Sequence, residues 1–133
     1  MISVHIKLFS DFSFKIYLDK ISIKKYRYAL TRLRLSSHRL AIESGRWHKP
    51  NRIPLNERKC LYCNKLEDEF HFIIECPLFE EYRNEFIKKY FWKKPNMIKF
   101  IELMKSENVS VVKKLSIYIH KSFIKRHETV FRT

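Results

Sequence analysis

All three cysteines of this chain fall within one short segment, together with a histidine. The segment CLYCNKLEDEFHFIIECP has the pattern C-x2-C-x7-H-x4-C, and its candidate ligands are Cys60, Cys63, His71 and Cys76. Zinc binds four nitrogen or sulfur ligands in a tetrahedron, and three cysteines with one histidine are a common structural set. Because four protein ligands leave no position open for water, we expect one structural Zn²⁺ and no catalysis at the metal.

Three alternative roles for the cysteines compete with zinc binding. They can be small buried hydrophobic residues beside an incidental histidine, or one disulfide with a spare thiol. A redox-active CxxC motif is the third, but it leaves His71 and Cys76 unexplained. The chain shows no export signal, so we expect an intracellular protein, nuclear or cytoplasmic and not secreted, in which close cysteine pairs favour metal over disulfides. The clustering of all four side chains therefore favours zinc.

The charge is distributed unevenly around this segment. The chain has a formal net charge of +14, with +10 in residues 1–59, −5 in residues 60–85 and +9 in residues 86–133. A strongly basic balance favours a polyanionic partner such as the RNA or DNA backbone. Three thiolates on one Zn²⁺ make the acidic segment still more negative, so we expect the flanking basic segments, and not the metal site, to contact phosphates.

The predicted phosphate contacts lie on two basic helices and involve no sequence readout. They are Lys24, Arg27, Arg32, Arg34, Lys113, Lys114, Lys121 and Lys125.

Hydrophobic periodicity predicts a mainly α chain, a small helical domain organised around the zinc site with little or no β-structure. Helices are expected over 21–35, 38–44, 78–92, 97–106 and 110–127, with a proline-containing loop between the second and third. Ser36 or Ser37 is a candidate cap for the second helix, and Gly45 is expected to close it in a left-handed conformation.

The predicted organisation has three parts. Residues 1–20 form an N-terminal extension, residues 21–92 the zinc-binding helical domain, and residues 97–133 basic C-terminal helices that pack on it.

Several functions are excluded by what the sequence lacks. Gly45 is the only glycine, so glycine-rich phosphate loops and a tight nucleophile elbow are absent. Asp11, Asp19 and Asp68 are widely separated and cannot form the aspartate pair of a polymerase. No apolar run is long enough to span a bilayer. We therefore expect a non-enzymatic protein with no small-molecule substrate and no membrane partner.

The metal segment and the residues before it resemble a known family. From Tyr17 to about Trp92 the chain is similar to the zinc-binding region that follows the reverse transcriptase of non-LTR retrotransposons. The resemblance is carried by RYALTRLRLSSHRLAIESGRW, ERKCLYCN and EDEFHFIIECPLF. It implies the same four metal ligands, a role in engaging RNA or DNA, and a reverse transcriptase domain as partner in the parent element. The chain then looks like an isolated terminal piece of such an element.

Some side chains admit two interpretations. Glu43 and Arg46 are expected to form an ion pair with Trp47 as an apolar anchor; the alternative is that Arg46 and Trp47 grip a nucleotide. Glu67 or Glu69 is a candidate acceptor for the second ring nitrogen of His71.

Two alternative functions stay open at this stage. One is a zinc-stabilised protein-interaction module that uses the acidic face and exposed aromatic residues around Phe79, Tyr82 and Phe86. The other is a fragment of a transposable element with no function.

Overall fold

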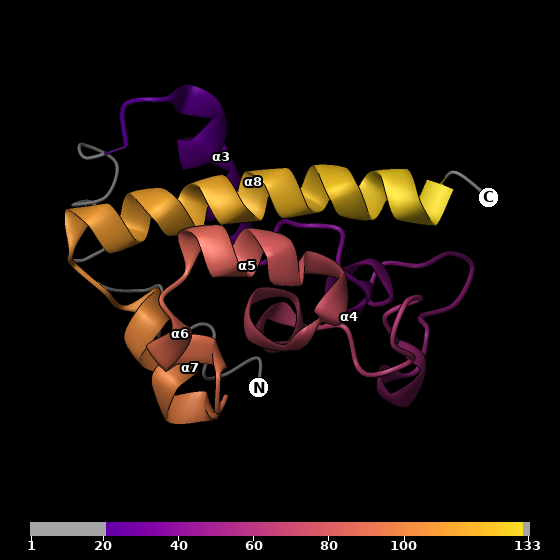
Figure 1. The fold of residues 1–133 in the computed structure, drawn as a ribbon. Coiled ribbons are helices and arrows are strands. Elements are labelled where there is room, and N and C mark those ends of the chain that lie inside the picture. Colours follow the sequence, from indigo (N-terminus) through magenta and orange to yellow (C-terminus); the bar gives the residue numbers. More distant parts are fainter. Residues whose placement is uncertain (1–20, 132–133) are drawn as a thin grey trace.

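The computed structural model describes residues 21–131, which are built almost entirely from helices (Figure 1). In chain order the helical elements are α3 Lys24–Arg34, α4 Ala41–Ser44, η1 Leu55–Glu57, η2 His71–Glu75, η3 Pro77–Phe79, α5 Glu80–Phe86, α6 Lys89–Trp92, α7 Met97–Met104 and α8 Val109–Phe131. Within these residues no strand forms, and one isolated antiparallel bridge joins Lys59 to Leu66. The mainly α prediction is confirmed. The predicted 1–20 extension lies outside the described residues.

The longest helix, α8, runs across the molecule between α3 on one side and α5 on the other (Figure 1). Its apolar stripe follows the predicted pattern, because Val112, Leu115 and Ile119 are buried while Lys113 and Lys114 are exposed. None of the helices in residues 21–131 combines the length and the apolar character needed to cross a bilayer.

The core joins α8 to the helices that precede it. Leu30 and Leu33 of α3 are fully buried in the same cluster as Leu115 of α8 and Phe72 of η2. The Phe72 ring lies 5.0 Å from the Phe79 ring in an edge-on arrangement. The segment expected to pack on the zinc-binding region thus shares one hydrophobic core with it.

The helix predicted over 78–92 is divided in two. Ile87 leaves the helical conformation, with φ −121° and ψ 128°, and separates α5 from α6. Its side chain is buried, and its carbonyl accepts a hydrogen bond of 2.9 Å from Trp92 Nε1. The periodicity of the sequence does not reveal this break, because it continues through Ile87.

Arg34 lies inside the protein, which corrects its prediction as a phosphate contact. Its side chain is buried, and Nη2 donates a hydrogen bond of 2.7 Å to the carbonyl of Met104 at the end of α7. The last carbonyls of a helix lack partners within the helix. Arg34 therefore joins α3 to the C-terminus of α7 and is not available to a nucleic acid.

The predicted left-handed closure at Gly45 is also wrong. Gly45 has ordinary right-handed angles, φ −66° and ψ −33°. A Cβ at this position would lie 2.7 Å from Arg58 Cγ, so glycine is needed for the close approach of Arg58. Ser36, just after α3, adopts left-handed angles instead, with φ 56°. No serine side chain caps α4; the Ala41 amide donates instead to Glu67 Oε1 at 2.7 Å.

Truncation of Ile119 tests the role of α8 in the core. Ile119→Ala removes a fully buried side chain and should lower the free energy of unfolding by about 2–5 kcal/mol, because a cavity remains. Ile124→Ala, on the same helix, removes a side chain that is 48% exposed and should change the free energy of unfolding much less. Urea unfolding followed by circular dichroism measures both, and equal losses would contradict this account of the core.

Candidate metal centre

The first two cysteines lie on a tight turn. The bridge between Lys59 and Leu66 brings the two ends of the turn together, and the Cys60 amide donates to the Lys65 carbonyl at 2.7 Å. Asn64 has φ 59°, a left-handed conformation that asparagine tolerates better than most residues. The turn thereby aims the side chains of Cys60 and Cys63 toward the same point.

The other two candidate ligands are joined by a π-helical turn, η2. In an α-helix, side chains five residues apart point in directions about 140° apart. In η2 the Cys76 amide instead donates to the His71 carbonyl at 2.8 Å, five residues back. This wider turn brings His71 and Cys76 to the same side. Cys76 itself is extended, as expected of a residue before proline.

The four side chains converge closely enough to bind one metal ion. Their ligand atoms all lie within 4.8 Å of one another. Cys76 Sγ is 3.9 Å from Cys60 Sγ and 3.5 Å from Cys63 Sγ. In a zinc tetrahedron with bonds of about 2.3 Å, two sulfurs are about 3.8 Å apart. The sulfur spacing therefore fits a tetrahedral site, and the predicted set of four residues is brought together.

His71 presents one nitrogen to the cluster and uses the other to hold its ring. Its Nδ1 lies 3.1 Å from Glu75 Oε1, so a proton on Nδ1 is donated to that carboxylate. Its Nε2 is buried and has no hydrogen-bond partner among the described residues. A buried nitrogen without a partner fits a metal ligand, because the metal would satisfy it. The predicted acceptors, Glu67 and Glu69, are wrong: Glu75 takes this role.

The carboxylates before His71 are directed into the protein. Glu67 accepts two hydrogen bonds from Arg126, of 2.8 and 2.7 Å. Asp68 Oδ1 accepts from the His71 amide at 2.9 Å, and Glu69 lies 3.4 Å from His38 Nε2. All three acids are buried. Part of the predicted acidic surface is therefore internal, where it orients the metal turn and anchors α8.

Close packing of the sulfurs changes their acidity. The hydrogen bond between Cys76 and Cys60 lowers the pKa of the Cys60 thiol to about 3 and raises that of Cys76. Burial raises the pKa of Cys63. Three adjacent sulfurs cannot all carry negative charge unless a cation balances them. A divalent metal supplies that balance, and its binding would release the remaining thiol protons.

Arg83 connects the metal turn to the core. Its side chain is buried; Nε donates to the Ile73 carbonyl and Nη2 to the Cys76 carbonyl, both at 2.8 Å. Tyr118 Oη donates to the Phe72 carbonyl at 2.6 Å and lies 3.2 Å from Arg83 Nη2. Burial raises the pKa of Tyr118 to about 12, so its hydroxyl stays protonated as a donor. These bonds give carbonyls at the end of η2 donors from α5 and α8.

The remaining predicted phosphate contacts differ in their exposure. Lys24 and Arg32 are exposed on α3, and Arg27 on the same helix is half-buried. Lys113 and Lys114 are exposed near the start of α8.

Two further predicted contacts cover aromatic rings of α5. Lys121 Nζ lies 5.2 Å from the centre of the Phe86 ring, and Lys125 Nζ lies 5.5 Å from that of Tyr82. Both lysines are half-buried. Each ammonium group is held by a cation–π contact next to α5, away from α3.

The aromatic interaction surface proposed as an alternative is not formed as predicted. Phe79 is 1% exposed and belongs to the core, and Tyr82 and Phe86 are half-buried. Trp47 was expected to be an apolar anchor but is 71% exposed. The neighbouring ion pair is as predicted, with Arg46 Nη1 3.7 Å from Glu43 Oε2.

Sequence reasoning missed several exposed basic and aromatic residues, namely Lys25, Tyr28 and Arg39. Tyr28 belongs to the same helix as the predicted contacts, but no sequence signal distinguishes an exposed tyrosine from a buried one. The four candidate metal ligands were found because cysteines and a histidine gathered in one short segment can be recognised from the sequence.

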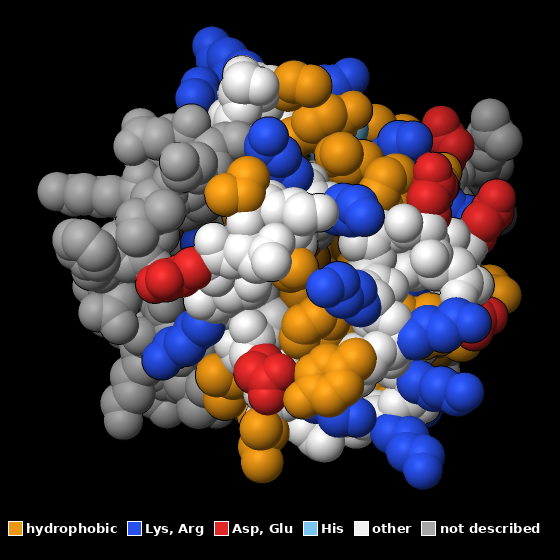
Figure 2. Space-filling model, turned by 60° about the vertical axis from the view of Figure 1, so that its left-hand side comes forward, with side chains coloured by type: hydrophobic (Ala, Val, Ile, Leu, Met, Phe, Trp, Pro, Cys, Tyr) orange, Lys and Arg blue, Asp and Glu red, His pale blue; other side chains and the backbone are white. Residues whose placement is uncertain are grey.

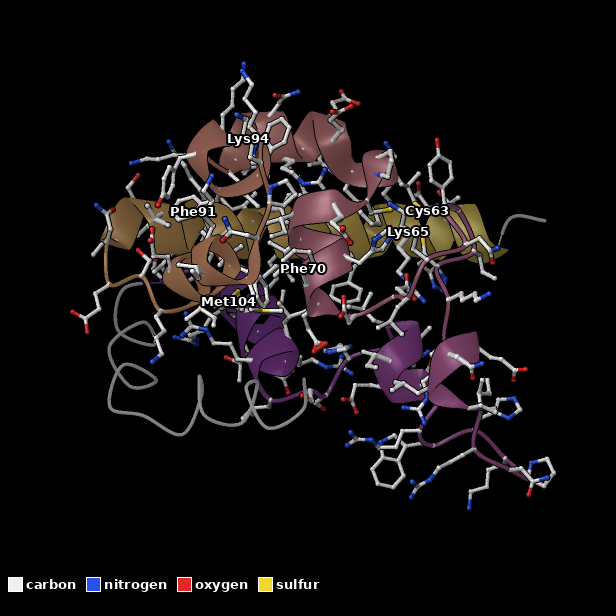
Figure 3. The ribbon with its side chains drawn as sticks, turned by 90° about the horizontal axis from the view of Figure 1, so that it is seen from below. Cys63, Lys65, Phe70, Phe91, Lys94 and Met104 are labelled. Atoms are coloured by element: carbon white, nitrogen blue, oxygen red, sulfur yellow. The ribbon has the colours of Figure 1, made fainter. Side chains whose placement is uncertain are left out.

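The position of the metal centre within the molecule is clear in Figure 3. Cys63 and Lys65 lie on one side of the view, and Phe91 and Lys94 lie toward the other. Leu61 and Tyr62, which lie between the two cysteines of the turn, are exposed. The cluster therefore lies at the edge of the core and not in its middle.

Comparisons with models of known protein families, with curated proteins and with solved structures found no match to this chain. The geometry itself identifies a small helical domain with a Cys3His cluster that can bind one metal ion.

Metal analysis of the purified protein tests the site directly. The chain should hold one zinc per molecule, and His71→Asn should lose most of it, because the fourth ligand is removed. His48→Asn is the matched control: His48 is exposed and lies outside the cluster. Atomic emission after dialysis gives the stoichiometry. A folded, zinc-free wild-type protein would contradict the assignment.

Loss of Arg83 should weaken both the fold and the metal site. Arg83→Met removes two charged hydrogen bonds to carbonyls in the core and should lower the free energy of unfolding by about 3 kcal/mol or more. Zinc should also be lost at a lower chelator concentration. Arg39→Met, at an exposed arginine, should stay within about 0.5 kcal/mol of the wild type. Chemical unfolding and competition with a chromogenic chelator measure the two effects.

Proposed function

We propose that this protein is a zinc-stabilised helical domain that binds RNA or DNA through its phosphate backbone. The observation that carries the zinc part is the convergence of Cys60, Cys63, His71 and Cys76, with sulfur spacings suited to a tetrahedron and a buried histidine nitrogen left for a metal. The residues thus fit Zn²⁺. When bound, the ion would link the cysteine turn to η2 and contribute folding free energy.

The nucleic-acid part is supported by charge. The chain carries 28 lysines and arginines against 14 acidic residues. Figure 2 shows lysine and arginine side chains distributed over one described face, more numerous than acidic ones, with hydrophobic side chains among them. Several acids of the metal segment are buried, as Glu67 and Asp68 are, and so contribute less repulsion at the surface than the sequence suggests.

The proposed role is non-catalytic. All four candidate ligands are protein side chains, so a metal held by them would have no open position for substrate or water. The resemblance to the zinc-binding region of non-LTR reverse transcriptases supports the same role. In this proposal the domain assists a polymerase by holding nucleic acid, and the chemistry belongs to the polymerase.

Binding should depend strongly on salt, because each phosphate contact releases counterions. If about four phosphates of an RNA single strand are contacted, the Kd should rise about 50-fold between roughly 50 and 200 mM salt. Fluorescence anisotropy with oligonucleotides of unrelated sequence measures this, and the affinities should be similar across sequences. Absence of binding at the lower salt concentration, or a Kd that does not change with salt, would contradict the proposal.

A further inference from the structure

A groove of about 1340 Å³ lies between α3, the loop around α4 and the second half of α8. Lys24, Tyr28 and Arg32 line it from α3, at positions that share one helical face. His120, Phe123 and Ile124 line it from α8 in the same way. The segment 38–47, which includes α4, borders the groove beside these two helices.

The lining of the groove is strongly basic. Five lysines and arginines line it, and Glu128 is the only acidic residue among its lining residues. The basic residues are Lys24, Lys25, Arg32, Arg39 and Arg126. Arg126 is paired with Glu67, whereas Lys24, Lys25 and Arg39 have exposed side chains. A concave surface with this charge attracts a polyanion more strongly than the same charges would on a convex surface.

Two aromatic rings are exposed in the same groove. Tyr28 is 60% and Trp47 is 71% exposed. Burial of a large aromatic side chain is favourable, so two exposed aromatic rings in a basic groove indicate a ligand that covers them. Unpaired bases do this, because every base has a flat face that stacks on an aromatic ring. In a duplex the base faces are already stacked on one another.

The acidic helix lies elsewhere. α5 carries Glu80, Glu81 and Glu85 and packs on α8, while α3 packs on α8 from another side (Figure 1). Lys121 and Lys125 belong to the α5 side, where they cover aromatic rings. A strand placed in the groove therefore approaches the basic residues of α3 and Arg39 without passing along α5.

We propose that this groove binds a single-stranded nucleic acid, with Lys24, Lys25 and Arg39 at its phosphates and Tyr28 and Trp47 stacked on unpaired bases. The inference rests on the proposed function and sharpens it. The ligand is an unpaired strand and not a duplex, and the binding residues are those of the groove and not the α5-facing lysines. The shared chemistry admits RNA or DNA.

The full zinc-loaded chain should be titrated with a labelled oligothymidylate of about 15 nucleotides, its RNA counterpart and a duplex of equal length. The unpaired strands should bind more tightly than the duplex. Tyr28→Leu and Trp47→Leu should each weaken binding to the unpaired strand about fivefold or more. Tyr90→Leu, at an exposed tyrosine of α6 outside the groove, is the matched control and should leave the affinity unchanged.

Two double variants, each of which removes two positive charges, test the basic residues. Lys24→Gln with Arg39→Gln should weaken binding and reduce its salt dependence, whereas Lys121→Gln with Lys125→Gln should do neither. In a Trp92→Phe background Trp47 is the only tryptophan, and its fluorescence should be quenched when bases stack on it. Circular dichroism confirms that each variant is folded.

The outcomes separate the two proposals. If salt-dependent binding persists but the duplex binds equally well, or if Tyr28 and Trp47 can be replaced without effect, the groove assignment is wrong and the proposed function stands. If no nucleic acid binds at low salt, both are wrong. If polyglutamate displaces the oligonucleotide at equal concentration of charge and leaves Trp47 unquenched, the groove is a general anionic surface and the inference is overturned.

Discussion

The arrangement of the metal centre depends on the hydrogen bonds that the buried guanidinium group of Arg83 donates. The turn that carries His71 and Cys76 ends at a proline, which has no N–H to donate to the carbonyls of the turn, and these carbonyls face the core. Arg83 satisfies two of them, and Tyr118 on α8 satisfies a third. Because one side chain contacts both the turn and α8, the metal ligands and the longest helix are held in one framework.

A second connection joins the far half of α8 to the same segment. Glu67 accepts two hydrogen bonds from Arg126 and one from the Ala41 amide. The carboxylate therefore links α8, the start of α4 and the residues before His71. The negative charge of Glu67 would repel phosphate if it lay at the surface. Here the carboxylate is buried, and its pairing with Arg126 offsets the cost of removing it from water. Because this negative charge is neutralised within the protein, it repels a polyanion in the basic groove beside α3 and α8 less.

Predictions from the sequence agreed with the structure where they rested on local properties of the chain, and failed where they depended on tertiary contacts. The Cys3His cluster and the apolar stripe of α8 were predictable, because ligand type and helical periodicity are local properties. Arg34, Phe79 and Trp47 were placed wrongly, since whether a side chain is buried depends on what packs against it. Glu75 was missed as the partner of His71, although side chains four residues apart meet on a helix, because only the acids before His71 were considered.

The sequence by itself determined that the chain is helical and basic and that it has four metal-ligand side chains in one segment. Those properties follow from residue types and short spacings, which no later contact changes. Only the tertiary structure decided which charges are available. It buried Arg34 against α7, paired Arg126 with Glu67 and placed Lys24, Tyr28, Arg39 and Trp47 around one groove. Exposure is set by contacts between distant segments, so a basic patch cannot be located from the sequence alone.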